Sequence, residues 1–126
     1  MEKQAAVYEE KRRYKRVSVD AEAVCEIFCV DSQSLLLNRH TPKIHAKVEN
    51  ISMGGMQIVI EKQVPKEQIL RMKITFGCGK VIWVYSQARW SVYDAKINKY
   101  RIGVQFFYLQ ERHRVVCAEI IESCTN

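Results

Sequence analysis

The sequence predicts a mostly β domain: a six-stranded antiparallel β-barrel with a C-terminal α-helix and a flexible basic N-terminal arm. The chain has 126 residues, enough for one ordinary domain with a single core. Six segments rich in alternating, β-branched or aromatic residues are joined by short turns, which favours antiparallel pairing. Six strands in so small a domain tend to curl into a barrel, which hides their edges.

The arm is expected over residues 1–16, and the barrel with its helix over 17–126. The arm lacks apolar periodicity and holds six basic residues against three acidic ones, with five basic residues crowded into positions 11–16. A solvated tail is the plain interpretation of such a charge run, and an anion-binding arm is the functional one.

The strands are identified by period-two alternation and by their turns. From Val17 to Cys29 every second residue is apolar or small, as in a half-buried strand. Pro42 and Pro65 lie in polar loops over 31–42 and 61–68, and GCGK at 77–80 is a tight turn. Strands are expected over 17–30, 43–51, 56–61, 69–76, 81–95 and 100–109.

The last segment has helical spacing instead. Val115, Val116, Ile120 and Ile121 recur on one side of a helix expected over 110–123. This helix is expected either to cap one opening of the barrel or to cover one side.

Two tryptophans lie in the expected strand over 81–95. Trp83 and Trp90 are seven residues apart, so they are predicted to face opposite sides, one in the core and one exposed. An exposed tryptophan near a binding site could stack a base.

The five cysteines include no C-x-x-C pair, so neither disulfides nor a metal site is expected. Cys25 and Cys29 are four residues apart, on the same face of the expected strand, which fits burial as small apolar residues. The net charge of +6 attracts anions: nucleic acid, nucleotides, phosphates or acidic membranes. No segment is long and apolar enough for a bilayer span, and the first residues do not read as a signal peptide, so the sequence predicts a cytoplasmic protein without membrane insertion.

Two clusters carry candidate chemistry. The first, ENISMGG at 49–55, follows a strand and offers the amide of Asn50, the hydroxyl of Ser52 and glycines that permit positive φ and close approach to the backbone. Alone, it also fits a plain hairpin turn. The second, KRRYKRV at 11–17, contains Arg12 and Arg16 at R-x-x-x-R spacing. An arginine fork pairs with guanine O6 and N7 and with phosphate oxygens.

Taken together, R-x-x-x-R before the first strand and N-x-S-x-x-G after the second resemble the PilZ family. YRIGVQF at 100–106 is similar to that family's final strand, so the likeness covers about residues 10–107. The resemblance implies a PilZ-like split barrel, six-stranded and antiparallel, with a trailing helix.

The resemblance also implies cyclic di-GMP as the ligand, with no other cofactor. By that likeness, Arg12 and Arg16 would hold guanine edges and phosphates, and Arg13 would stack on a base or contact phosphate. Asn50 and Ser52 would meet the second guanine and a phosphate, and Gly55 would keep the turn open. The arm would be loose when empty and ordered over the nucleotide when bound.

The family pattern accepts Asp or Asn where this chain has Asn50. An amide has one carbonyl oxygen where a carboxylate could accept two N–H groups, so somewhat weaker binding is expected. The sequence leaves open whether one nucleotide or a stacked pair binds.

No set of catalytic residues stands out, so the sequence predicts a binding protein rather than an enzyme. The leading hypothesis is a cyclic di-GMP effector that signals to an unidentified protein partner in flagellar, pilus or polysaccharide machinery. One alternative is a PilZ-form interaction adaptor that binds no nucleotide and uses the barrel surface or the loop with Leu35, Leu36 and Leu37. Another is a single-strand nucleic-acid binder, although no DNA partner is expected.

Overall fold

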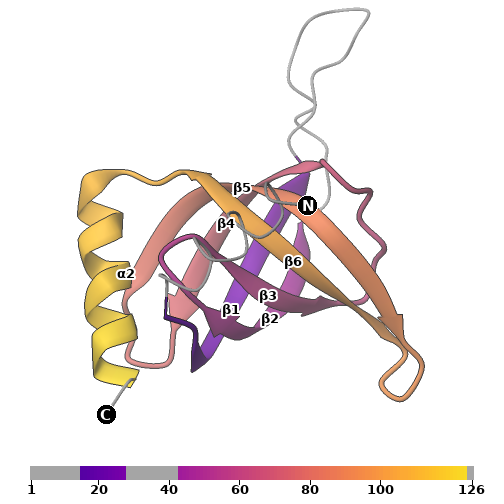
Figure 1. The fold of residues 1–126 in the computed structure, drawn as a ribbon, viewed down its shortest axis with the longest axis horizontal. Helices are drawn as coiled ribbons and strands as arrows, with labels where there is room; N and C mark the ends of the chain where they lie inside the picture. The colour runs from indigo at the N-terminus through magenta and orange to yellow at the C-terminus, as the bar shows by residue number, and fades with distance from the viewer. Residues whose placement is uncertain (1–14, 28–42, 125–126) are drawn as a thin grey trace, which may run out of the picture.

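A computed structural model describes residues 15–27 and 43–124 of the chain. These residues form six strands and one helix (Figure 1). The elements are β1 (Val17–Ile27), β2 (Ile44–Ile51), β3 (Gly55–Ile60), β4 (Ile69–Phe76), β5 (Val81–Asp94), β6 (Lys99–Tyr108) and α2 (Glu111–Cys124).

The strands close into a barrel in the order β1-β2-β3-β6-β5-β4, with every pair antiparallel. Consecutive strands pair with each other except β3 and β4; β3 instead pairs with β6, and β4 pairs with β1. The predicted fold class is therefore confirmed. The chain turns at Gly79, with φ of 93°, and at Asn98, with φ of 54°, residues of the types that tolerate this conformation.

The alternation read from the sequence matches the barrel interior. Along β1, Val17, Ala21, Ala23 and Cys25 are buried between exposed or half-buried neighbours. The other strands add large apolar side chains that are fully buried, among them Ile51, Ile58, Leu70, Met72, Ile74, Ile82 and Ile102. Burial of this apolar surface is the main force that closes the sheet.

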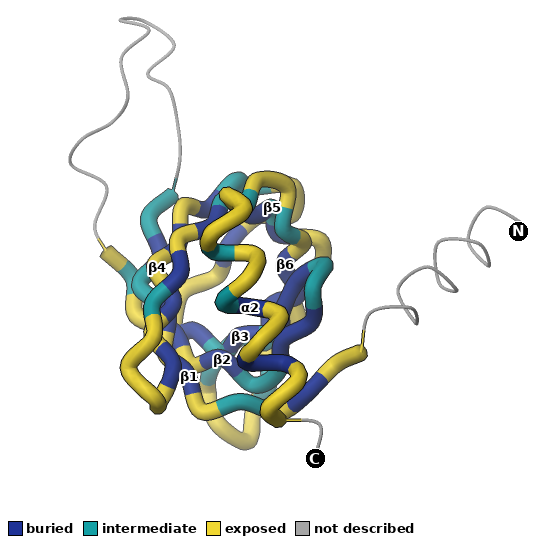
Figure 2. The backbone as a smooth tube through the Cα atoms, turned by 90° about the vertical axis from the view of Figure 1, so that its left-hand side faces the viewer, coloured by how far each residue is buried: buried dark blue, intermediate teal, exposed yellow. Residues whose placement is uncertain are grey.

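Helix α2 lies across one end of the barrel, so of the two expected positions it takes the cap (Figure 2). It buries Cys117, Ile120 and Ile121 against the open end, and contacts β5 and β1. At its edge, Lys80 Nζ lies 2.9 Å from Glu119 Oε2.

The arm over 1–14 and the loop with its three leucines lie outside the described residues, so their predicted structure stays a prediction. Within residues 15–27 and 43–124, no helix is long and apolar enough to cross a membrane.

Candidate functional site

The turn between β2 and β3 is built by Ser52. Its backbone N–H donates to the carbonyl of Gly55 over 2.8 Å, and its Oγ accepts from Gly54 N over 3.2 Å. The hydroxyl also lies 3.3 Å from Gly55 O as a donor. Because Ser52 is 5% exposed and its hydroxyl is used in both directions, it shapes this turn from inside.

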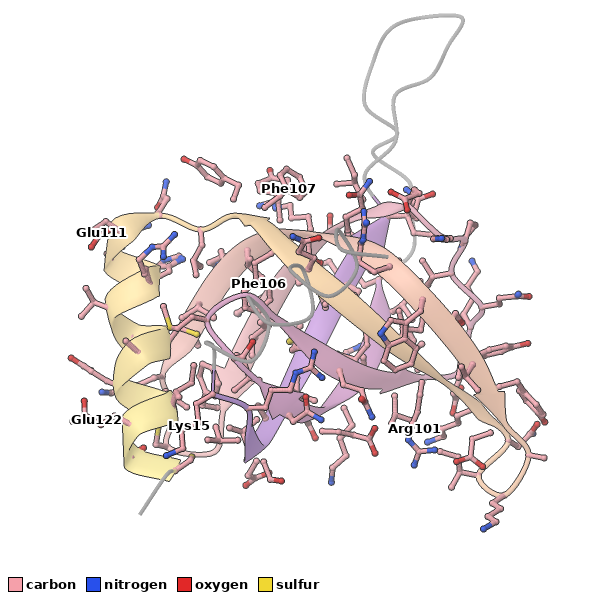
Figure 3. The ribbon with its side chains drawn as sticks, viewed as in Figure 1. Lys15, Arg101, Phe106, Phe107, Glu111 and Glu122 are labelled. Carbon is pink, nitrogen blue, oxygen red and sulfur yellow. The ribbon has the colours of Figure 1, made fainter. Side chains whose placement is uncertain are left out.

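One reason expected for the glycines of this turn, a positive φ, does not apply. Neither Gly54 nor Gly55 has positive φ. A Cβ on Gly55 would lie 2.2 Å from the carbonyl oxygen of Val104 on β6, so only glycine fits. The Gly54 carbonyl accepts from Phe106 N over 2.9 Å, and Phe106 lies beside the turn (Figure 3). The turn is therefore held against β6.

Asn50 stands just before this turn with an unsatisfied acceptor. It pairs with Ser18 of β1 and Gln57 of β3, next to an irregularity of register between Val48 and Asn50. Its Oδ1 is buried and has no hydrogen-bond partner among the residues that the structure describes. An unpaired buried acceptor costs about 1–3 kcal/mol, which makes this oxygen a candidate for a ligand's N–H donors.

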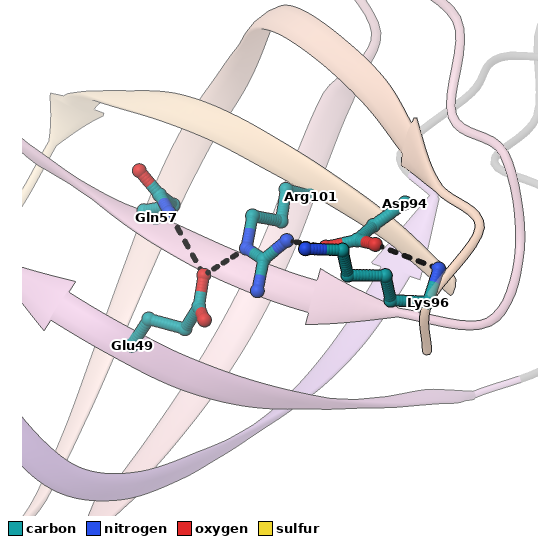
Figure 4. A network of polar contacts seen from close by, with 5 residues as sticks. All are labelled: Glu49, Gln57, Asp94, Lys96 and Arg101. Atoms are coloured by element: carbon teal, nitrogen blue, oxygen red, sulfur yellow. Dashed lines mark hydrogen bonds and ion pairs between the residues drawn. The ribbon is translucent and has the colours of Figure 1, made fainter. Parts of the chain in front are cut away.

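A polar network lies beside Asn50 on the outer face of the barrel (Figure 4). Glu49 Oε1 accepts from Gln57 Nε2 over 2.8 Å and from Arg101 Nε over 3.0 Å. Arg101 also pairs with Asp94, whose Oδ1 accepts from Lys96 N over 2.9 Å. The network connects β2, β3, β6 and β5 around the backbone that carries Asn50.

Electrostatics in this network follow from the hydrogen bonds. Burial pushes the pKa of Glu49 upward, but the hydrogen bonds from Gln57 and Arg101 outweigh burial, and the pKa lies below its ordinary value. The hydrogen bond from Arg101 lowers the pKa of Asp94 as well, and the two carboxylates raise the pKa of Arg101. Both acids are therefore charged at neutral pH.

Trp90 lies on the same outer face. The register places Asn50, Gln57, Gly103 and Trp90 in a row across β2, β3, β6 and β5. The indole of Trp90 crosses the Gly103 backbone so closely that a Cβ there would be 2.1 Å from Nε1. A half-exposed aromatic ring thus stands at the far end of the row from the unpaired oxygen.

The prediction that one tryptophan is buried is wrong. Trp83 is 39% exposed and Trp90 is 38% exposed. The reason is a bulge in β5: Ala88 pairs with Val104, but Trp90 pairs with the next residue of β6, Gly103. The extra residue, Arg89, resets the alternation, so both indoles point outward.

The register of β1 against β2 places Arg16 next to the turn at 52–55. Val17 pairs with Ile51 and Ser18 with Asn50, so the preceding Arg16, which is exposed, stands beside the start of the turn at Ser52. The structure thus brings Arg16, Asn50, Ser52 and Gly55 together, whereas Arg12 and Arg13 lie outside the described residues.

The network of Glu49, Gln57, Asp94 and Arg101 was not identified from the sequence. Its members come from four strands; Glu49 lies inside ENISMGG and Arg101 inside YRIGVQF, but neither of them was assigned a role from the sequence. Across residues 15–27 and 43–124, no three His, Cys, Asp or Glu side chains gather in a way that could hold a metal ion.

Solved structures share this fold. MotI/DgrA, the inhibitor of motility of Bacillus subtilis, is similar with a TM-score of 0.68 and 16% identity over 90% of this chain and 49% of that one. The PilZ domain of Escherichia coli YcgR, solved with c-di-GMP, gives 0.62 and 18% over 91% and 92%. MrkH of K. pneumonia, in complex with c-di-GMP, gives 0.64 and 13% over 89% and 50%.

The chain therefore spans about half of MotI/DgrA and of MrkH, and nearly all of the YcgR domain. No curated protein sequence matches the chain. The sequence pattern of the PilZ domain matches residues 10–123, which include the turn, the network and the capping helix. On that match, with the barrel it shares with solved PilZ proteins, this chain belongs to the PilZ domain family.

Proposed function

We propose that this protein is a cyclic di-GMP receptor that binds the dinucleotide on the outer face of the barrel, around the turn at 52–55. The observation that carries the proposal is the buried Oδ1 of Asn50, at a motif position, which has no partner in the described part of the chain. A guanine edge offers the N–H donors that this oxygen lacks. Family membership and the c-di-GMP complexes of YcgR and MrkH support the choice of ligand.

In this proposal the cations supply the affinity for the anionic ligand. Arg16 stands beside the turn, where its guanidinium can pair with guanine O6 and N7 or with a phosphate. Arg12 and Arg13, four and three residues before Arg16, would complete the grip as the arm orders over the nucleotide.

Ser52 and Gly55 act mainly through the shape of the turn. The hydroxyl of Ser52 already donates within the turn, so a phosphate would have to replace Gly55 O as its acceptor. Gly55 keeps β3 close to β6, which sets where the turn's backbone meets the ligand.

Trp90 adds a surface for a base. Its half-exposed indole lies three strands from Asn50, roughly 14 Å at the usual strand spacing. A base stacked there would lie on the same face as the base held by Asn50.

The output of binding is a change read by a partner protein, in motility, adhesion or exopolysaccharide control. The protein is proposed to act by binding alone, without catalysis, since no set of catalytic residues stands out in its sequence.

Calorimetry at near-physiological salt tests the proposal. Wild type is expected to bind cyclic di-GMP saturably and GTP or single-stranded DNA not at all. Arg16→Gln is expected to abolish measurable binding while leaving the fold intact, because it removes one bidentate donor fork.

Lys66→Gln is the charge-matched control, since Lys66 is exposed in the β3–β4 loop and is not part of the turn at 52–55. Undiminished affinity in Arg16→Gln would refute the assignment of that residue. No binding by wild type would favour a PilZ-form adaptor without a nucleotide role.

A further inference from the structure

A second surface, away from the turn, combines exposed aromatic and cationic side chains. We call it the basic aromatic face; it lies over β4, β5, the end of β6 and the start of α2. Its residues are Arg71, Trp83, Tyr85, Phe107, Tyr108 and Arg112. Phe107 is 55% exposed and Tyr108 53% exposed, values that stand out for large apolar rings.

These residues meet because of strand pairing. Arg71 pairs with Tyr85 across β4 and β5, and Tyr85 pairs with Tyr108 across β5 and β6. Ser86 then pairs with Phe106, so Phe107 is the extra residue of a bulge, and it lies on the outside at the end of β6 (Figure 3). Arg71, Trp83, Tyr85, Tyr108, Arg112 and His113 line a shallow pocket in this face.

The cations of the face are not engaged in ion pairs with described residues, although Glu26 of β1 lies beside Arg71 in the register. Arg71 lies 4.8 Å above the ring of Trp83, and Lys73 pairs with Trp83 in the register. Neither these two cations nor Arg112 forms an ion pair with any residue in 15–27 and 43–124. The nearby Glu111 engages Arg114. An acidic partner would therefore gain from this field.

The arrangement of the rings favours a protein segment over nucleic acid. Stacked bases need free ring faces. Here the Tyr85 ring is tilted by 47° to Phe107 and by 62° to Tyr108, with centroids 6.1 Å away in both cases, and Arg71 covers the ring of Trp83. Tilted rings around a pocket instead accept apolar side chains, as protein interfaces commonly do.

The basic aromatic face is also connected to the proposed cyclic di-GMP site along one strand, β6. Phe106 N holds the Gly54 carbonyl of the turn, and Gly55 pairs with Gln105. The next two residues, Phe107 and Tyr108, belong to the basic aromatic face. A shift of the turn against β6 would therefore reach the face within two residues.

We propose that the basic aromatic face is the docking surface for an acidic segment of a partner protein that carries apolar anchors. Arg71 and Arg112 receive carboxylates, and the pocket beside Trp83 receives an apolar side chain. Docking itself does not require cyclic di-GMP; its coupling to the turn through β6 rests on the proposed function.

The chain has two tryptophans, Trp90 near the proposed cyclic di-GMP site and Trp83 in the basic aromatic face. Tryptophan fluorescence can therefore monitor the two sites separately. In a Trp90→Phe variant the remaining Trp83 reports on the basic aromatic face. The probe is a synthetic peptide of alternating Glu and Leu, about twelve residues long, titrated at near-physiological salt. We expect a saturable change in Trp83 emission, and no change with a Lys and Leu peptide of the same length.

Removing both guanidinium groups tests the charges. Arg71→Gln with Arg112→Gln is expected to weaken peptide binding about tenfold or more, in the range of hot-spot losses. The matched control is Lys62→Gln with Lys66→Gln, which removes the same charge from an exposed loop elsewhere. An equal loss in both double variants, or the absence of a Trp83 response, would overturn the proposal.

Nucleic acid is tested on the same variant. A single-stranded oligo-dT that binds more tightly than the acidic peptide, and loses affinity with Arg71→Gln, would also overturn it. In the Trp83→Phe variant, Trp90 reports on cyclic di-GMP. Unchanged Trp90 emission on addition of cyclic di-GMP would count against the proposed cyclic di-GMP receptor function. Unchanged Trp83 emission on addition of the acidic peptide would count against docking, so the two failures are distinguishable.

Discussion

At the scale of single residues, the sequence and the structure both indicate Asn50 as part of the proposed ligand site. The motif resemblance predicted it as a ligand residue, and the structure adds that its carbonyl oxygen is buried and has no hydrogen-bond partner within residues 15–27 and 43–124. Such a group lowers stability in the empty protein and is expected where binding supplies the missing donor. Most buried polar groups that serve the fold alone have a hydrogen-bond partner.

Asn50→Ala is therefore expected to separate binding from stability. Affinity for cyclic di-GMP should fall about tenfold or more, because the acceptor is lost. The free energy of unfolding should stay within about 1 kcal/mol of wild type, because loss of the unpaired oxygen offsets loss of packing. Calorimetry and urea unfolding measure the two quantities, and wild-type affinity in the variant would contradict the assignment.

Gly55→Ala should do the reverse and act on the fold. Its Cβ would meet the backbone oxygen of Val104 at 2.2 Å, which forces β3 away from β6. Overpacking of this kind costs typically about 1–3 kcal/mol. Gly77→Ala is the matched control: its Cβ would meet Asp20 Oδ2 at 2.6 Å, and that side chain can move aside. Equal urea midpoints for the two variants would refute the close-approach explanation.

At the scale of elements, the alternation of β1 could be predicted, whereas the break of alternation in β5 could not. The period-two pattern of β1 gave the correct inward residues, Ala21, Ala23 and Cys25. In β5 the same rule failed for Trp90, because one extra residue at a bulge reverses the parity. Bulges depend on the partner strand, and a single strand's sequence does not reveal them.

The Arg101 network should make the sheet sensitive to acid. Glu49 and Asp94 have pKa values below their ordinary values of 4.5 and 3.8, so their stabilising contribution is present above those values. It is lost as the pH falls through the lowered pKa values of the folded state. Arg101→Met removes the partner of both acids, so its unfolding free energy should fall less steeply below about pH 4.5.

Urea unfolding across the acid range measures this slope. Arg89→Met is the control, because Arg89 pairs with Glu67 on an exposed loop. A slope in Arg101→Met as steep as in wild type would show that the network does not supply the acid sensitivity.

At the scale of the whole molecule, the barrel and its capping helix enclose two thiols. Burial raises the pKa of Cys25 to about 12 and that of Cys117 to about 11. Both thiols are therefore protonated and unreactive in the native protein, and for Cys25 the burial was predicted from the alternation of its strand. Cys78 and Cys124 are exposed.

Alkylation with iodoacetamide followed by peptide mass mapping should show this division. Cys78 and Cys124 are expected to react in the native state, and Cys25 and Cys117 only on unfolding. Because the main strand contacts of α2 are with β5 and β1, whereas β1 is paired on both edges, Cys117 should become reactive at lower urea than Cys25. Simultaneous reaction would mean that helix and barrel unfold as one unit.

The site itself was only partly predictable for a reason of topology. The motifs at 11–17 and 49–55 are local in sequence, so the resemblance could point to Arg16, Asn50, Ser52 and Gly55. The network and the basic aromatic face arise where β6 pairs with β3 and β5. β3 and β6 are far apart in the sequence, and their pairing is set by closure of the barrel. No residue spacing within the sequence indicates a contact of this kind.

Closure of the barrel through β1 has a consequence for how the chain folds. β1 pairs with β2, the next strand, but also with β4, so Ala23 must meet both Ala46 and Ile74. During synthesis the second of these partners emerges about fifty residues after β1. Contacts this distant slow the search for the native state. One edge of β1 therefore stays unpaired during synthesis until β4 has been made. At this edge the nascent chain is most exposed to pairing with a wrong strand.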